Sequence, residues 1–273
     1  MQSHSMKSIT IITILLAVML TVVSFLGVFD ETTYERDAAS MAAQGAGQDA
    51  VNLFIVIPLL ILALVFVNRD SKPGYFVYAG TIFYLLYSFF IYAFGVHFNR
   101  LFLFYCAILG LSLYAFILIL IRLNGMEVKN WFKDTMPVRS IGIFMLIVSA
   151  MFYVLWLKSV LPAILSNTVP AEVADYKLLV NPVHVLDLSI VLPGLVITAV
   201  LLWKKHKIGL ILTPTALVFI LILAVALIGM VIMLDIKGVA EDASIAWIFA
   251  VLAVISAVFL FVFLRNLRTG SNR

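Results

Sequence analysis

Eight apolar stretches, each about 20 residues long, follow one another along the chain. They cover roughly residues 8–28, 50–67, 74–94, 101–121, 140–160, 182–203, 208–234 and 244–264. A helix needs about 20 apolar residues to cross the hydrocarbon core of a bilayer. Strands of a membrane barrel would alternate apolar and polar residues, whereas these runs are continuous. The sequence therefore predicts an all-α polytopic protein with eight transmembrane helices, whose first partner is the lipid bilayer.

Composition leaves little else for the chain to form. Hydrophobic residues make up 64% of it, charged residues only 12%, and the mean hydropathy is +1.16, whereas soluble domains carry ~25% charged residues. The single cysteine, Cys106, rules out a disulfide framework and a cysteine-rich metal site. The first run exceeds the ~7–15 residues of a signal-peptide core, so we interpret it as a retained helix. We expect residues 38–50, rich in alanine, to form an outside loop with a helical start.

Charge placement predicts the orientation. If the N-terminus is inside, most of the 18 Lys and Arg residues lie in inside segments and most of the 14 acidic residues lie outside. The positive-inside rule favours this arrangement, which puts both termini in the cytoplasm and the protein in the plasma (inner) membrane. The net charge of +4 follows from basic residues spread over the loops and the tail. It therefore gives no reason to expect a nucleic-acid partner.

The chain also contains an internal repeat. Residues 48–74 and 183–209 align without a gap, each position pairing with the one 135 residues later. The most informative identities are helix-breaking or charged residues: Pro58/Pro193, Lys72/Lys207 and Gly74/Gly209. The alignment predicts two parallel four-helix repeats, residues 1–135 and 136–273, related by a pseudo-two-fold axis along the membrane normal. We expect the second and sixth helices to lie next to that axis.

The repeat places polar residues at equivalent positions. Asp49 and Asn52 stand three residues apart in one copy, as His184 and Asp187 do in the other, so each pair shares a helix face. We expect all four side chains to converge in the outer half of the bundle. An acid in the first turn of a helix can also be an ordinary partner of the helix dipole, but Asp187 lies a full turn deeper, where an ionisable group is costly and usually functional.

These residues suggest a site for an ion or small molecule. His184, Asp187 and Asp49 offer imidazole and carboxylate ligands suited to a divalent cation, and His184 and Asp187 could instead share a coupled proton. Tyr84, near the middle of the third run, needs a partner for its hydroxyl, either at this polar centre or at a backbone carbonyl. Trp156 is expected in the aromatic belt at the membrane interface.

Three classes of function remain open. A small secondary transporter or ion-coupled permease fits a parallel repeat with proline-broken helices. A non-catalytic sensor, subunit or assembly factor fits equally well. A membrane-embedded metal-dependent enzyme is less favoured, because the sequence contains no phosphate loop, no nucleophile elbow, no His-Glu-x-x-His and no Cys-x-x-Cys. The prediction therefore leans away from an enzyme.

Overall fold

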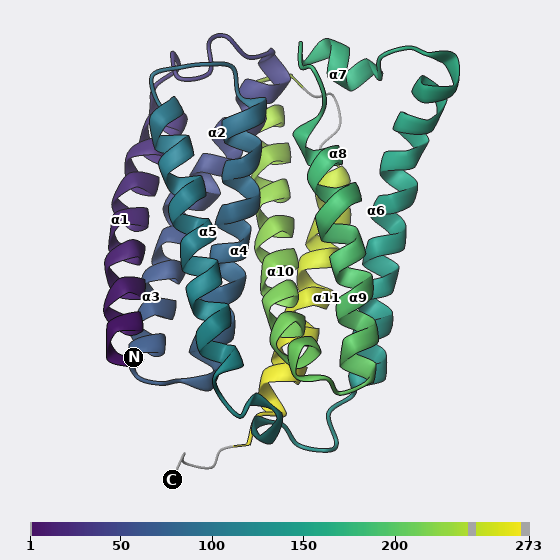
Figure 1. Ribbon diagram of the computed structural model, residues 1–273. Helices are drawn as coiled ribbons and strands as arrows, with labels where there is room; N and C mark the ends of the chain where they lie inside the picture. The colour runs from purple at the N-terminus through teal and green to yellow at the C-terminus, as the bar shows by residue number, and fades with distance from the viewer. Residues whose placement is uncertain (1, 240–243, 269–273) are drawn as a thin grey trace.

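The computed structural model describes residues 2–239 and 244–268, and this part of the chain is helical with no named strand. Eight helical segments are long and apolar enough to cross a membrane, which confirms the predicted all-α, multi-pass class. The segments run side by side as one bundle, and the start of the first helix and the end of the last helix lie at the same end of it (Figure 1). We call this the inner end and the opposite one the outer end.

Six of the eight segments are single α-helices. They are α1 (Gln2–Phe29), α4 (Lys72–Gly95), α5 (Phe102–Asn124), α6 (Val138–Ser166), α10 (Lys207–Ile236) and α11 (Ile245–Arg265). The second segment is a composite of α2 (Ala39–Val51), η1 (Asn52–Val56) and α3 (Ile57–Asn68). The sixth is a composite of α8 (Pro182–Leu186), η3 (Asp187–Val191) and α9 (Leu192–Trp203). Two short helices, η2 (Val128–Trp131) and α7 (Ala171–Asp175), lie in connecting segments.

The composite segments contain π-helical turns at corresponding places. The turns η1 and η3 span residues 52–56 and 187–191, and each is followed two residues later by a proline, Pro58 or Pro193. Proline has no N–H, so the carbonyl four residues before it lacks its usual α-helical donor. In a π-turn a carbonyl bonds the N–H five residues later instead of four. Such turns occur mostly as single insertions in α-helices and often mark functional sites.

The inner turns after these two segments also have the same local structure. Asp70 and Lys205, 135 residues apart, adopt left-handed φ angles of 54° and 49°. The Ser71 amide donates to the Phe66 carbonyl at 3.0 Å, and the His206 amide donates to the Leu201 carbonyl at 2.9 Å. Residues 52–74 and 187–209 thus pass through the same succession of π-turn, α-helix, left-handed residue and new helix.

Helices α4 and α10 occupy the centre of the bundle. They pack against each other, while α2 packs against α10 and α8 packs against α4, as Figure 1 shows. Their close approach depends on Gly80, because a Cβ there would lie 2.6 Å from Val218 Cγ1 and 2.8 Å from the Thr215 carbonyl oxygen. The second and sixth segments flank this central pair.

The alanine-rich stretch also differs from its prediction. Instead of a loop, residues 39–51 form helix α2, which packs along α10 and extends the second membrane segment outward. Its small residues, including Ala43, Ala46 and Gly47, are buried. Because they present almost no side chain, the two backbones come close enough that a Cβ at Gly47 would lie 2.7 Å from Met230 Cα.

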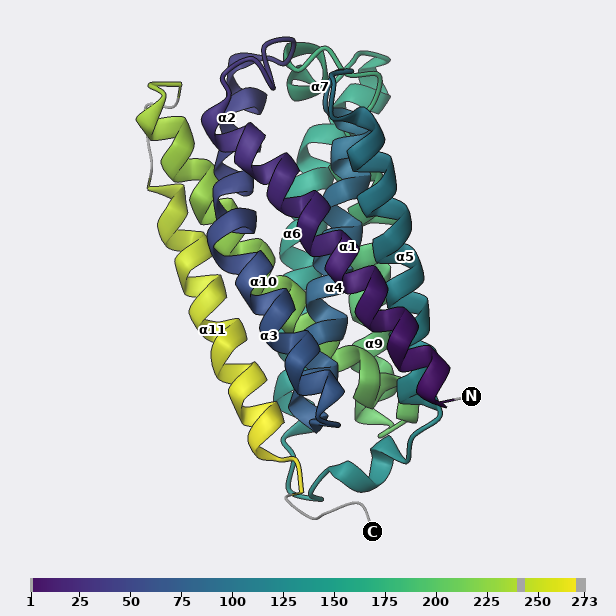
Figure 2. The ribbon, with the colours of Figure 1, turned by 90° about the vertical axis from the view of Figure 1, so that its left-hand side faces the viewer.

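The inner end is closed by aromatic residues. The segment between α5 and α6 places Trp131 and Phe132 in the core, where both stack around Phe76 at ring-centroid distances of 5.8 and 6.1 Å. Phe263 of α11 packs on the same cluster. Figure 2 shows this segment beneath the bundle, with α1 crossing the face of the bundle and α11 at its edge. The link between the two halves of the sequence is therefore packed rather than loose.

Candidate functional site

Asp49 lies in the interior of the outer half of the bundle. Its side chain is fully buried, and its carboxylate accepts hydrogen bonds from the Ser24 hydroxyl at 3.1 Å and from the Tyr34 hydroxyl. Gly27 of α1 makes room for it, since a Cβ at that position would collide with the carboxylate. The sequence places Asp49 near a helix end exposed to water. In the structure, α2 adds ten residues of helix before it, so Asp49 lies inside the segment.

The Tyr34 side chain reaches Asp49 from an outer segment, residues 30–37, that is docked on the turn between α4 and α5. Asp37 accepts from the His97 ring at 2.8 Å, and Arg36 donates to the Phe98 carbonyl at 2.8 Å. Burial, followed by the nearby Asp49 charge, raises the pKa of Tyr34 well above its usual value. The phenol therefore stays neutral, and its hydroxyl donates a hydrogen bond to the Asp49 carboxylate. Together these contacts form an outer cap over the carboxylate.

Asn52 lies one turn deeper, at the start of η1. Its Oδ1 accepts from the Tyr84 hydroxyl of α4 at 3.0 Å, so Tyr84 meets the polar residues of the second segment and not a backbone carbonyl. Asn52 is fully buried, and its Nδ2 has no hydrogen-bond partner within residues 2–239 and 244–268. The Ser88 hydroxyl, one turn along α4 from Tyr84, is also buried and unpaired there. This cluster therefore retains unused hydrogen-bonding capacity.

Asp187 occupies the equivalent position at the start of η3. Its carboxylate accepts from the Tyr87 hydroxyl at 3.1 Å and from the Trp156 indole N–H at 2.7 Å. The side chain is 94% buried, with 6% exposed, and it lines a small cavity of about 20 Å³ among apolar residues. Trp156 was expected at the membrane interface, but its polar edge points inward to this acid. The reason is that the Asp187 carboxylate gives the Trp156 indole N–H the hydrogen-bond acceptor that lipid hydrocarbon lacks.

His184 lies one turn outward from Asp187, on the same segment. Its Nε2 is 3.7 Å from Glu172 and 3.5 Å from the Asn181 amide nitrogen, and its ring lies 4.7 Å from that of Trp156. Burial raises the pKa of Glu172, but hydrogen bonds from Ser159 and the backbone, with His184 nearby, outweigh it and leave that pKa below the usual value. His184 thus faces the outer end rather than Asp187.

The structure groups the predicted residues into two sites instead of one. Asp49, Asn52 and Tyr84 form the first, and His184 and Asp187 form the second, with Tyr84 and Tyr87 of α4 bonded to Asn52 and Asp187 respectively. The expected convergence of all four polar residues is therefore wrong. Within the described ranges, no three His, Cys, Asp or Glu residues stand close enough to share a metal ion, so Asp49 does not join His184 and Asp187 in one ligand set.

Five residues that contact the two sites are not among the predicted site residues: Ser24, Tyr34, Tyr87, Trp156 and Glu172. Tyr87 had a visible signal, since it follows Tyr84 by three residues and so shares its helix face. That spacing lets one helix serve both sites. Tyr34 and Glu172 had none, because each belongs to a connecting segment whose path depends on the tertiary fold.

The chemistry common to both sites is a buried carboxylate held by neutral donors. Asp49 has a serine and a tyrosine, and Asp187 has a tyrosine and a tryptophan. Neither carboxylate makes an ion pair with a Lys or Arg of the described chain.

Comparisons with protein-family models, with curated proteins and with solved structures find no match to this chain. The two buried carboxylate sites are therefore the features that bear on its function.

Proposed function

We propose that this protein is a proton-coupled secondary transporter of the plasma (inner) membrane, with Asp49 and Asp187 as its proton-binding groups. The observation that carries the proposal is the pair of carboxyl groups buried within membrane-spanning helices, each beside a π-turn and each without a Lys or Arg partner among residues 2–239 and 244–268. An ionised acid inside a membrane costs about 2.5–3.5 kcal/mol even on insertion scales. Acids kept there are usually parts of ion or proton pathways.

The coupling ion that suits these sites best is the proton. A divalent cation would need several oxygen or nitrogen ligands around it, and the described residues contain no group of three ionisable ligands. Each carboxyl group can by itself bind and release one proton, and its tyrosine, serine or tryptophan donors can reorient or relax when it does. His184 and Glu172, outside Asp187, would then form the outer approach to the second site.

We further propose that the chain consists of two parallel four-helix repeats, residues 1–135 and 136–273. Support comes from contacts that exchange partners between the halves. Gly95 approaches Pro182, whose Cγ would lie 2.8 Å from an added Cβ, and the residues equivalent to this pair, Met230 and Gly47, also meet. Gly80 touches Thr215, its own equivalent, as residues next to a two-fold axis do.

This arrangement suits alternating access. In transporters built from repeats, substrate and ion sites lie where broken helices meet the boundary between the repeats. Here α2 with η1 and α8 with η3 are such helices, and both lie against the α4–α10 pair that would contain the axis. Relative movement of the halves about that pair would change which side each carboxyl group faces. We place both termini on the cytoplasmic side, in line with the basic inner segments.

Proteoliposomes containing a pH-sensitive dye test the proposal. A panel of small-molecule classes is added outside under an imposed pH gradient, and internal pH is followed for the wild type, Asp49→Asn and Asp187→Asn. We expect at least one class to drive proton movement in the wild type and neither variant to support it. Asp134→Asn is the matched control, because its side chain is 92% exposed outside the spans. Equal proton movement in all four proteins would refute the proposal.

A second candidate function is that of a membrane sensor or non-catalytic subunit. The observation that favours it is the closed outer end, where Tyr34 and the docked segment 30–37 cover Asp49. The cavity at Asp187 is also small, about 20 Å³. A sensor would change conformation with pH but move no solute. Its signature in the same vesicles would be a pH-dependent change in tryptophan emission with no proton movement.

A further inference from the structure

A large apolar groove runs between α6 and α11 in the second half of the bundle. Its cavity volume is about 540 Å³, and of the described residues that line it only Ser140 is polar. The walls are formed by aliphatic side chains such as Ile143, Ile147, Val251 and Ile255. Pockets of about 300–1,000 Å³ with mainly apolar walls are the size of small-molecule sites.

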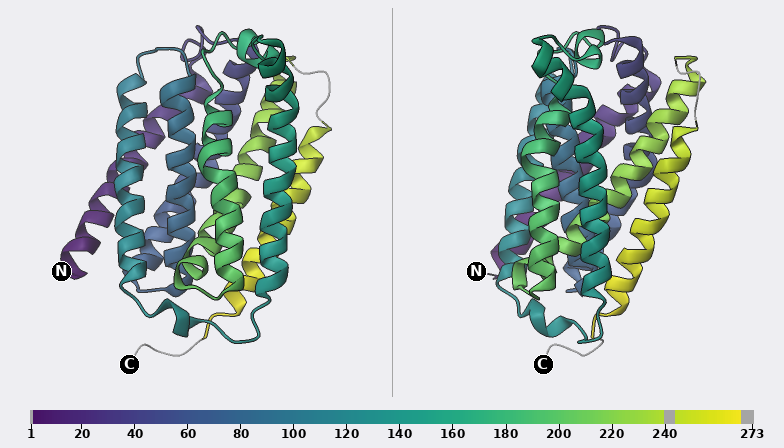
Figure 3. Two further views of the ribbon diagram at one scale, coloured as in Figure 1. Left: turned by 45° about the vertical axis from the view of Figure 1, so that its right-hand side comes forward. Right: turned by 90° about the vertical axis from the view of Figure 1, so that its right-hand side faces the viewer.

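The groove opens sideways, toward the region that lipid would occupy. Ile147 and Val251, on opposite walls, are 61% and 57% exposed. In the first half, α1 packs directly against α5, but the corresponding helices α6 and α11 make far less contact. Phe144 and Phe259 join them near the inner end, with ring centroids 4.8 Å apart. Figure 3 shows α6 and α11 together at this edge of the bundle.

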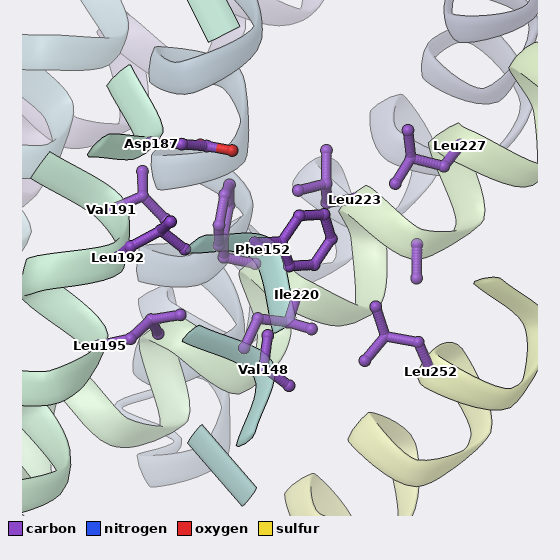
Figure 4. A pocket seen from close by; sticks show the side chains of 12 residues that line it. Val148, Phe152, Asp187, Val191, Leu192, Leu195, Ile220, Leu223, Leu227 and Leu252 are labelled. Carbon is purple, nitrogen blue, oxygen red and sulfur yellow. The ribbon is translucent and has the colours of Figure 1, made fainter. Parts of the chain in front are cut away.

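The inner wall of the groove leads to Asp187. Val148 and Leu252 line both the groove and the small cavity that contains the carboxylate. In Figure 4, Asp187 points into this cavity above Phe152, and Val148 and Leu252 lie at its far side. Among the described residues, Asp187 is the only charged one that lines either space. The groove and the cavity that contains Asp187 thus adjoin at Val148 and Leu252; joined, they would give a lipophilic molecule an apolar passage from the membrane to a buried acid.

We propose that this passage binds a lipophilic amine that enters from the bilayer, with its hydrocarbon part in the α6–α11 groove and its protonated nitrogen on the Asp187 carboxylate. The inference rests on the proposed function, because it names the substrate class of the transporter's second site. Charge complementarity selects the amine. A cation at Asp187 gains a charge-assisted hydrogen bond, whereas a fatty acid would bring a second negative charge beside it.

The amine also fits the proton chemistry of the site. Asp187 can hold either a proton or an ammonium group, and one excludes the other. The protonated amine binds only after the Asp187 carboxyl group has released its proton to water, so one cation replaces the other on the same carboxylate. Tyr87 and Trp156 hold the carboxylate in place for both partners.

Photo-crosslinking in phosphatidylcholine nanodiscs tests the inference. The probe is dodecylamine with a diazirine on its hydrocarbon chain, and labelled peptides are identified by mass spectrometry. We expect label on α6 and α11 facing the groove, removed by excess dodecylamine but not by dodecanoic acid or dodecanol. Asp187→Asn should lower labelling at these positions roughly tenfold, the effect of one lost charge-assisted hydrogen bond.

Two further variants separate the groove from the general lipid surface. Ile255→Trp fills the groove and should abolish the label, whereas Val254→Trp, on the neighbouring residue that is 64% exposed and does not line the groove, should leave it unchanged. Both add the same ring to the same helix, so a general disturbance of α11 would affect both. The measurement is made at equilibrium without a pH gradient, so it does not depend on transport.

Three results would overturn the inference. Equal competition by dodecanol and dodecylamine would show a groove that holds any acyl chain. Labelling unaffected by Asp187→Asn would remove the acid from the site. Absence of groove label, together with cross-linked pairs of chains through α6 or α11, would mean that a second copy covers the groove. Any of these alongside intact proton movement in vesicles would reject the amine while leaving the transporter proposal in place.

Discussion

The contact between α2 and α10 at Gly47 gives a stability prediction whose size can be worked out. A Cβ added there would collide with the Gly229 carbonyl oxygen and would lie 2.7 Å from Met230 Cα and 2.8 Å from the Gly229 carbonyl carbon. Ordinary contact begins at 3.4 Å. All three obstructing atoms belong to the backbone of α10, so no side-chain rotation can relieve the overlap.

Gly47→Ala should therefore destabilise the protein by about 2 kcal/mol. Raising the 2.7 Å distance to 3.4 Å alone needs a separation of roughly 0.7 Å, and the closer Gly229 oxygen needs more; overpacking of this kind costs about 1–3 kcal/mol. We take the upper end, because backbone atoms face each other. Alanine in place of a helical glycine returns up to about 1 kcal/mol, which leaves the net loss.

Gly110→Ala in α5 is the matched control. It is also a glycine within a helix, but a Cβ there would meet nothing within 4 Å, so the variant should gain about 0.5–1 kcal/mol. Unfolding by sodium dodecyl sulfate in mixed micelles, followed by tryptophan emission, measures both. The two substitutions should shift the midpoint in opposite directions. Equal stabilisation by both would refute the close α2–α10 contact and, with it, the exchange of contacts between the halves.

Three further predictions concern the sites and the orientation. The pKa of Glu172 is lowered in the folded protein, so its contribution to stability is complete above the unfolded pKa of ~4.3 and is lost as pH falls through the lower folded value. In a thermal-shift series, the melting temperature should fall more steeply at acid pH in the wild type than in Glu172→Gln, and parallel curves would contradict this. Tyr87→Phe removes one donor to Asp187 and should cost about 1–3 kcal/mol, with a much smaller cost in an Asp187→Leu background, which has no acceptor for the hydroxyl, so additive losses in a double-mutant cycle would rule out that bond. In a Cys106→Ser background, a cysteine at Glu31 should react with impermeant reagents from outside intact cells and one at Lys129 only after lysis; the reverse pattern would invert the topology.

The class of the protein was determined by the sequence alone. Eight apolar runs predict eight helices because a chain in lipid must satisfy its backbone hydrogen bonds within each segment, and this local requirement can be read without knowing the neighbours. The repeated positions of Pro58 and Pro193 likewise depend on local chemistry. The structure places helix, π-turn and inner turn at the same 135-residue spacing around them.

Side-chain partners were decided only by the tertiary structure. Asp49 appears from the sequence to lie near water, because an alanine-rich stretch precedes it, yet that stretch folds as α2 and buries the acid. Alanine favours a helix by itself, but burial of this helix follows from its small residues, which let α2 pack closely on α10. A pattern of small residues does not say which helix will approach them.

The separation of the two polar sites has the same origin. Positions 135 residues apart share a local environment, but whether their side chains meet depends on how the helices pack. Gly80 lets α4 and α10 pack closely at the centre, and Asn52 and Asp187 meet Tyr84 and Tyr87 of α4 rather than each other. The sequence thus determined which residues are polar within the membrane, through the free-energy cost of placing them there, and the packing of backbone against backbone decided which partners offset that cost.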